Sequence, residues 1–342
     1  KSKYQGLSFT TSLFFMKNFK LKTHYKKILA DTISPVSVYL KIRDQFPNSI
    51  LLESSDYHGN DNSFSYICCN PIASIKVEAN LITKTYPDHT FETKTVESDM
   101  VTAEIDAFTK QFETQNDKTF KFINNGMFGF TAYDAVKYFE DITISKKDHS
   151  IEIPDMYYAV YQNIIAINHF KNEAYLFAHC FERESNIEAI DHLIKMQSFS
   201  SYDFKSKGKI SSNLTDKAFK SNVDLAKKHC NRGDVFQLVL SKKFQQDFKG
   251  DDFNVYRALR SINPSPFLFY FDYGKFKIFG SSPEAQLVVE NQKAEIHPIA
   301  GTFARTGDDL KDAELAKKLV ADKKENSEHV MLVDLARNDL SR

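Results

Sequence analysis

Residues 157–170, YYAVYQNIIAINHF, decide the fold class of this chain. The stretch is rich in β-branched and aromatic residues, which favour extended backbone, so it predicts a long β-strand. Segments of similar character precede it and are separated from one another by turn formers: 50–55, 65–69, 73–78 and the glycine-marked 126–134. The first half of the chain is therefore predicted to be mainly β-structure.

The second half adds further strands and several helices. Strands are expected at 235–244, 266–273, 276–282 and 285–290, and the short loop at Gly274 predicts that 266–273 and 276–282 form a hairpin. Helices are expected at 37–46, after Val101, from Thr215 to a stop at Gly233, at 254–262, and in the charged region that ends the chain. This order predicts an α+β fold class with large antiparallel β-sheets packed with helices.

We divide the chain into four regions by composition. Residues 1–19 are interpreted as a leader or an added segment, and the native protein is expected to start at Met16, after residues 1–15. Residues 20–197 form an N-terminal region, and the Ser/Lys/Gly-rich residues 198–213 are expected to be a linker. Residues 214–342 are then expected to form a catalytic domain.

Composition excludes some partners. The formal net charge is zero, and the chain has no concentrated basic stretch of the kind that binds nucleic-acid phosphates. No apolar run approaches the roughly 20 residues of a membrane-spanning helix. The four cysteines lack zinc-type spacing, which favours reduced thiols in a cytoplasmic protein.

Several residues near the end of the chain have the chemistry of a binding site. Glu325 and Glu328, three residues apart on an expected helix, share one face, and paired carboxylates are suitable Mg²⁺ ligands. A solvated helix face explains the same spacing. Gly301 and Thr302, followed by Arg305, could hold a carboxylate at a turn, although a plain turn has the same residues.

One further carboxyl group is a candidate acid. Glu284 follows an expected strand end in SSPE (281–284), where it could protonate a leaving group. Pro283 is equally suited to a simple turn.

The order of these segments resembles that of the chorismate-utilising enzymes, most closely anthranilate synthase component I. The resemblance covers nearly everything from about Lys20 onward, and its fold is the one expected above. It is carried by LLESSD (51–56), GDVFQLVLSKKF (233–244), NPSPFLFYFD (263–272), FGSSPE (279–284), HPIAGT (297–302) and SEHVMLVDLARNDLSR (327–342).

The resemblance implies a role for each matching residue. Gly301, Thr302 and Arg305 would bind chorismate, Glu328 would be a ligand of Mg²⁺, and Glu284 would be the acid that helps the C4 hydroxyl leave. Residues of two distant segments would bind L-tryptophan as a feedback inhibitor and are expected to meet across two sheets: Ser54, Pro266, Phe267 and Leu268.

Two positions indicate the branch of the family. Relatives that add water have a lysine base where this chain has Gln237, and an amide cannot deprotonate water, so the nucleophile should be ammonia. Many aminodeoxychorismate synthases have a nucleophilic lysine where this chain has Ala300. These differences, with the LLES segment, favour anthranilate synthase.

The implied function is the conversion of chorismate and ammonia to anthranilate and pyruvate in tryptophan biosynthesis, in the cytoplasm. Ammonia would come from a separate glutamine amidotransferase subunit, anthranilate synthase component II, since the chain shows no Cys-His-Glu amidotransferase signature. The alternatives are aminodeoxychorismate synthase component I or a non-catalytic fragment that binds tryptophan or a partner.

Two departures from the family pattern stand out. Phe303 and Ala304 occupy the place of the usual Arg-Pro, which alters the loop before Arg305. The family also continues well past Arg342, with a second metal-binding glutamate and further substrate contacts. We therefore expect residues 1–342 to be inactive alone.

Overall fold

The computed structural model describes residues 17–54, 63–114, 120–144 and 152–341. The chain forms two compact units. The first comprises Lys1–Phe199 with Asn263–Arg342, and the second comprises Ser200–Ile262. This division differs from the four predicted regions, because the chain returns to the first unit after residue 262.

The first unit is built on an eleven-stranded sheet, counted over the described residues. Its main path runs β13-β12-β2-β3-β8-β9-β1-β6. Off this path, β4 pairs with β3, β5 pairs with β4, and β7 pairs with β8. The strands are β1 (Phe19–Leu29), β2 (Ile50–Glu53), β3 (Phe64–Glu78), β4 (Leu81–Thr85), β5 (Phe91–Thr95), β6 (Phe112–Thr114), β7 (Met127–Thr131), β8 (Met156–Asn168), β9 (Glu173–Cys180), β12 (Phe267–Asp272) and β13 (Lys277–Ser282).

The predicted α+β fold with a large antiparallel sheet is confirmed. The strand expected at 157–170 is β8, which pairs antiparallel with β3, β7 and β9. Only the pairing of β1 with β6 is parallel among the described strands. Because β8 lies inside the sheet and is buried along nearly its whole length, it needs a continuous apolar sequence rather than an alternating one.

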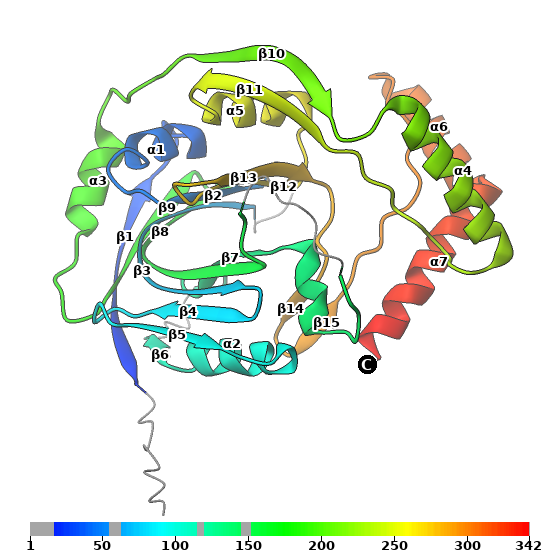
Figure 1. Cartoon of the computed structure of the whole chain (residues 1–342). Helices are drawn as coiled ribbons and strands as arrows, with labels where there is room; N and C mark the ends of the chain where they lie inside the picture. The colour runs from blue at the N-terminus through cyan, green and yellow to red at the C-terminus, as the bar shows by residue number, and fades with distance from the viewer. Residues whose placement is uncertain (1–16, 55–62, 115–119, 145–151, 342) are drawn as a thin grey trace, which may run out of the picture. The chain divides into compact units, whose positions relative to one another are not determined.

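The predicted hairpin is also confirmed. β12 and β13 pair antiparallel around a turn in which Gly274 has a φ of 74°, a conformation that glycine adopts without strain. β12 then pairs with β2, with Leu268 opposite Glu53. Two segments far apart in sequence thus become neighbouring strands (Figure 1).

Three helices accompany the sheet: α1 (Pro35–Ile42), α2 (Val101–Thr109) and α3 (Ile187–Lys195). Val101 and Phe108 of α2 are fully buried in a cluster with β1, β3 and β4. A second cluster gathers side chains of β2, β3, β8, β9 and β12, many of them aromatic. Short 3₁₀ turns lie at η1 (Ser98–Met100) and η2 (Tyr133–Tyr138).

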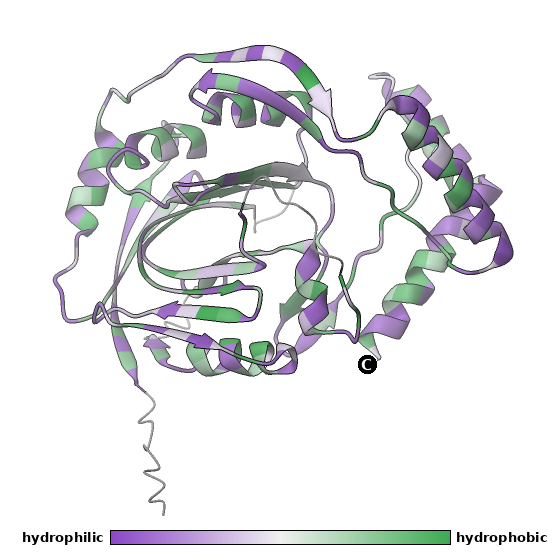
Figure 2. Cartoon of the chain, in the orientation of Figure 1, coloured by the Kyte–Doolittle hydropathy of each residue, from purple (hydrophilic) through white to green (hydrophobic). Residues whose placement is uncertain are grey.

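The chain ends in a short ribbon and two helices: β14 (Val288–Glu290), β15 (Lys293–Glu295), α6 (Asp309–Ala321) and α7 (Lys323–Leu340). Asp308 and Asp322 cap the two helices with their carboxylates. Hydrophobic and hydrophilic residues are interspersed along both helices (Figure 2), and neither contains a buried residue.

The second unit contains α4 (Asp216–Arg232), α5 (Phe253–Ile262) and an antiparallel ribbon of β10 (Phe204–Ser212) and β11 (Phe244–Gly250). The predicted stop and start of α4 are confirmed: the Thr215 side chain accepts from the Ala218 amide, and Gly233 is left-handed with a φ of 79°.

Two expectations for this unit are wrong. The segment 198–213, expected to be a linker, contains β10, because backbone pairing with β11 gives extended structure to a sequence with weak β-propensity. The strand expected at 235–244 is absent except for its last residue, Phe244. No strand among the described residues pairs with 235–243, and an unpaired strand lacks its main stabilisation.

Within the described chain, every helix is too short or too polar to cross a bilayer. All four cysteines are free thiols, and Cys68, Cys69 and Cys180 are buried.

Candidate active and regulatory sites

A large cavity of about 1130 Å³ opens on the aromatic face of the first unit. Ser54, at the end of β2, lines it together with Pro266, Phe267 and Leu268, at the start of β12. All four residues predicted to bind tryptophan therefore meet at one cavity. They meet within one sheet and not across two, because β2 and β12 are adjacent strands.

The chemistry of this cavity is mainly apolar. Aromatic side chains of β3, β7 and β12 line it: Phe64, Tyr66, Phe130, Phe269 and Phe271. Burial raises the pKa of Tyr66, so its phenol stays neutral. Glu53, which is 4% exposed, and Ser54 add polar groups beside the apolar walls. A cavity of this kind suits an aromatic ligand with a polar end.

A second group of predicted residues lies where the segment 297–302 approaches α7. The Glu325 carboxylate lies directly against Gly301, since a Cβ at that position would overlap Oε2 of Glu325. Glu325 also has a weak ion pair with Lys324, with Nζ 3.4 Å from Oε1. A larger residue at this position would displace the Glu325 carboxylate, so the glycine permits a contact between the expected substrate turn and the expected metal helix.

Glu328 lies one turn further along α7 and is half-buried. It forms no ion pair or side-chain hydrogen bond with another described residue, so its carboxylate is available to a ligand. Two carboxylates on one helix face suit Mg²⁺, which takes one or two protein carboxylates and completes its shell with water and substrate. Among the described residues no cluster of three such ligands is present, so an ion at Glu325 and Glu328 would need water or substrate to complete its shell.

Arg305 is held by a carboxylate of the protein itself. Its Nε lies 3.1 Å from Oδ2 of Asp312 on α6, while the Thr306 amide and hydroxyl donate to Oδ1 at 2.7 and 2.8 Å. The Thr306 amide, with this hydroxyl and Arg305, holds the pKa of Asp312 below its ordinary value. Arg305 must therefore exchange or share this partner before it can bind a substrate carboxylate.

Glu284 is exposed and lies two residues beyond the end of β13, as predicted. Its amide donates to the hydroxyl of Ser282 at 3.3 Å, which fixes the turn around Pro283. Ser282 is in turn opposite Phe267 in the β12–β13 ladder. The hairpin thus connects the large cavity to the candidate acid.

The remaining predicted site residues, Thr302 and Gln237, are less closely associated with the other site residues. Thr302 is exposed, and no hydrogen bond among the described residues joins it to Glu284 or Glu328. Gln237 belongs to the second unit, where it is exposed in the segment that forms no strand.

Sequence reasoning missed two contacts of these sites. The closeness of Gly301 to Glu325 links segments separated by a whole helix, and no local pattern signals it. The role of Asp312 as the partner of Arg305 has a weak signal, since an acidic residue in the first turn of a helix commonly binds donors of the preceding loop.

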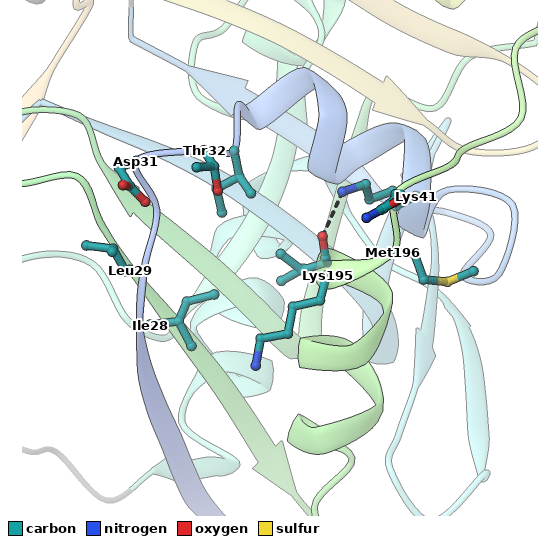
Figure 3. A pocket seen from close by; sticks show the side chains of 10 residues that line it. Ile28, Leu29, Asp31, Thr32, Lys41, Lys195 and Met196 are labelled. Carbon is teal, nitrogen blue, oxygen red and sulfur yellow. Dashed lines mark hydrogen bonds between the residues drawn. The ribbon is translucent and has the colours of Figure 1, made fainter.

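Another cavity, of about 700 Å³, lies where β1 ends beside α1 and α3 (Figure 3). Lys41 donates to the carbonyl oxygen of Ile194 at 2.7 Å, and burial lowers the pKa of this lysine. The bond satisfies a carbonyl in the last turn of α3. None of the predicted site residues lines this cavity.

Comparison with known proteins agrees with the fold and with the order of the site segments. A family profile described as chorismate binding enzyme matches residues 50–342. The chain therefore belongs to the family of chorismate-binding enzymes.

Its relatives include two kinds of synthase. Anthranilate synthase component 1 of Aquifex aeolicus is 30% identical over 95% of this chain and 68% of its own length. Aminodeoxychorismate synthase component 1 of Bacillus subtilis is also 30% identical, over 93% of this chain and 67% of its own. The crystal structure of anthranilate synthase component I from Streptococcus pneumoniae superimposes with a TM-score of 0.62 at 27% identity, covering 92% of this chain and 68% of that one.

Proposed function

We propose that this protein is the synthase subunit that makes anthranilate from chorismate and ammonia, under feedback control by L-tryptophan. The main observation that supports this proposal is the cavity at which Ser54 meets Pro266, Phe267 and Leu268. A tryptophan site suits feedback control of an enzyme of tryptophan synthesis, because L-tryptophan is the end product of that synthesis. Membership of the chorismate-binding family supports the choice of substrate.

The proposed reaction consumes one chorismate and one ammonia and yields anthranilate, pyruvate and water. Ammonia attacks C2 of the ring, the double bonds shift, and the C4 hydroxyl leaves as water with a proton from Glu284. The aminated ring then loses the C2 proton and its enolpyruvyl group, which takes up a proton and departs as pyruvate. The resulting ring is aromatic, which drives this last step.

The residues of the chain have separate tasks in this scheme. Gly301 and Thr302 offer backbone and hydroxyl donors to the substrate, and Arg305 binds a carboxylate once it is freed from Asp312. Glu328, with Glu325 beside it, would hold Mg²⁺. When bound, the ion neutralises the negative charge of the ring carboxylate. Gln237 provides no base for water, which leaves ammonia as the nucleophile.

The proposal includes a partner and a location. A separate glutamine amidotransferase subunit would supply ammonia, and the protein would work in the cytoplasm. Feedback inhibition would pass along the β12–β13 hairpin, because tryptophan against Phe267 would alter the strand that precedes Glu284.

We also keep a second candidate, aminodeoxychorismate synthase component I. The relative of that name from Bacillus subtilis is as similar in identity as the anthranilate synthase of Aquifex aeolicus. Such an enzyme would transfer the nitrogen to C4 of the ring and would release no pyruvate.

Tryptophan binding tests the observation that carries the proposal. We expect L-tryptophan to bind the chain and to raise its melting temperature, because a ligand that binds only the folded state stabilises it. The chain contains no tryptophan, so the fluorescence of the ligand can be followed without background. Ser54→Phe should abolish both effects by filling the cavity.

A matched control is Ser201→Phe, which places the same ring at an exposed position of the second unit. This variant should bind tryptophan as the unchanged protein does. If folded protein ignores millimolar tryptophan in calorimetry, the regulatory proposal fails and the aminodeoxychorismate alternative gains support.

A further inference from the structure

A small cavity of about 120 Å³ lies beside the irregular part of β3, and none of the candidate site residues discussed above lines it. The ladder between β3 and β8 shifts register between Pro71 and Ala73, and Asn70 just before the shift has a φ of 59°. A residue other than glycine in this conformation is uncommon, and bulges of this kind often re-aim a side chain. Here the side chain of Asn70 turns onto Gln162 of β8.

The side chain of Gln162 lines the cavity and is only 5% exposed. Its Oε1 accepts from Nδ2 of Asn70 at 2.6 Å. Its Nε2 has only long contacts, 3.5 Å to Oδ1 of Asn186 and 3.8 Å to Sγ of Cys180. Oδ1 of Asn186 already accepts a bond of 2.7 Å from Asn163. Both hydrogen bonds of this Nε2 are therefore long, and a closer acceptor in the cavity could replace one of them.

Two basic side chains, Arg183 and His89, line the same cavity. The Arg183 guanidinium donates to Nε2 of His89, so its partner is another basic group. Asp88, next to His89, is occupied: it pairs with Lys17 at 2.8 Å and accepts from the Thr90 amide at 3.0 Å. Within the described part of the chain, Arg183 forms no ion pair with a carboxylate.

We propose that this cavity binds one small oxyanion, which replaces His89 as the partner of the Arg183 fork and also accepts from the amide groups of Gln162 and Asn70. A planar guanidinium binds two oxygens of a carboxylate or phosphate at once, which an imidazole nitrogen cannot match. The volume accommodates an inorganic ion or a single carboxylate group and is far below that of pockets for drug-sized ligands. The site is separate from the large cavity, so it is independent of the function proposed above.

Calorimetric titration of the whole chain with two probes tests the proposal. Inorganic phosphate and acetate are added separately, at constant ionic strength set with sodium chloride, so that general salt effects cancel. We expect saturable binding of at least one probe at millimolar concentration. Preference for phosphate would assign a tetrahedral oxyanion to the site, and preference for acetate would assign a carboxylate.

Variants identify the location of the binding. Arg183→Gln should weaken the binding of the preferred probe at least tenfold. Gln162→Leu should also weaken this binding, although it keeps the volume of the side chain. Arg257→Gln removes an exposed arginine that does not line the cavity and should bind like the unchanged protein. Melting curves without anion show whether Gln162→Leu still folds.

Arg183 is exposed, so Arg183→Gln should fold normally and is the decisive variant. Absence of saturable binding with both probes would overturn the proposal. Equal affinity of the unchanged protein and Arg183→Gln would overturn it as well.

Discussion

Replacing Glu328 by Gln should lower the rate of anthranilate formation by about 10²- to 10³-fold. The substitution keeps the shape of the side chain and removes the charge that would hold Mg²⁺ against the substrate. A metal ion contributes several kcal/mol of charge stabilisation in such reactions, and each 1.36 kcal/mol corresponds to a factor of ten in rate. The measurement is anthranilate fluorescence in the complete protein at limiting Mg²⁺.

Asn326→Ala is the matched control for this prediction. Asn326 lies in the same helix, is exposed, and has no assigned role, so its loss should change the rate little. An unchanged rate for Glu328→Gln would instead place Glu328 on a solvated helix face.

Replacing Glu284 by Gln should lower kcat by about 10²- to 10⁴-fold, the range typical of a general acid. The effect should fall on kcat more than on KM, because Glu284 would act on the departing hydroxyl and not on the bound ground state. Steady-state kinetics with chorismate, using ammonium salts as the nitrogen source, would measure both constants.

Glu290→Gln serves as the control, since Glu290 is exposed at the end of β14, the next strand after β13. It should keep normal constants. If Glu284→Gln retained full kcat, the acid would have to be another group, and Glu284 would be only part of the turn after β13.

Local signals in the sequence predicted much of this fold. The long apolar run of β8, the turn at Gly274, and the Thr215 and Gly233 boundaries of α4 each follow from a few neighbouring residues. These features depend on backbone preference and capping, which a sequence displays directly. The order of segments in the chain then indicated the family.

Features that depend on distant partners were not predictable in the same way. β10 is a strand because β11 pairs with it, and 235–243 is not one because no described strand does. The meeting of Ser54 with Leu268 in one sheet depends on the choice of β2 as the neighbour of β12. The contact of Gly301 with Glu325 likewise depends on how a loop meets α7.

The most direct test of the proposed function is the identity of the product that the protein makes. The complete protein would be incubated with chorismate, an ammonium salt and Mg²⁺, and the mixture separated by liquid chromatography with mass detection. The proposed function predicts anthranilate and pyruvate in equal amounts, both dependent on ammonia. Accumulation of 4-amino-4-deoxychorismate without pyruvate would contradict it.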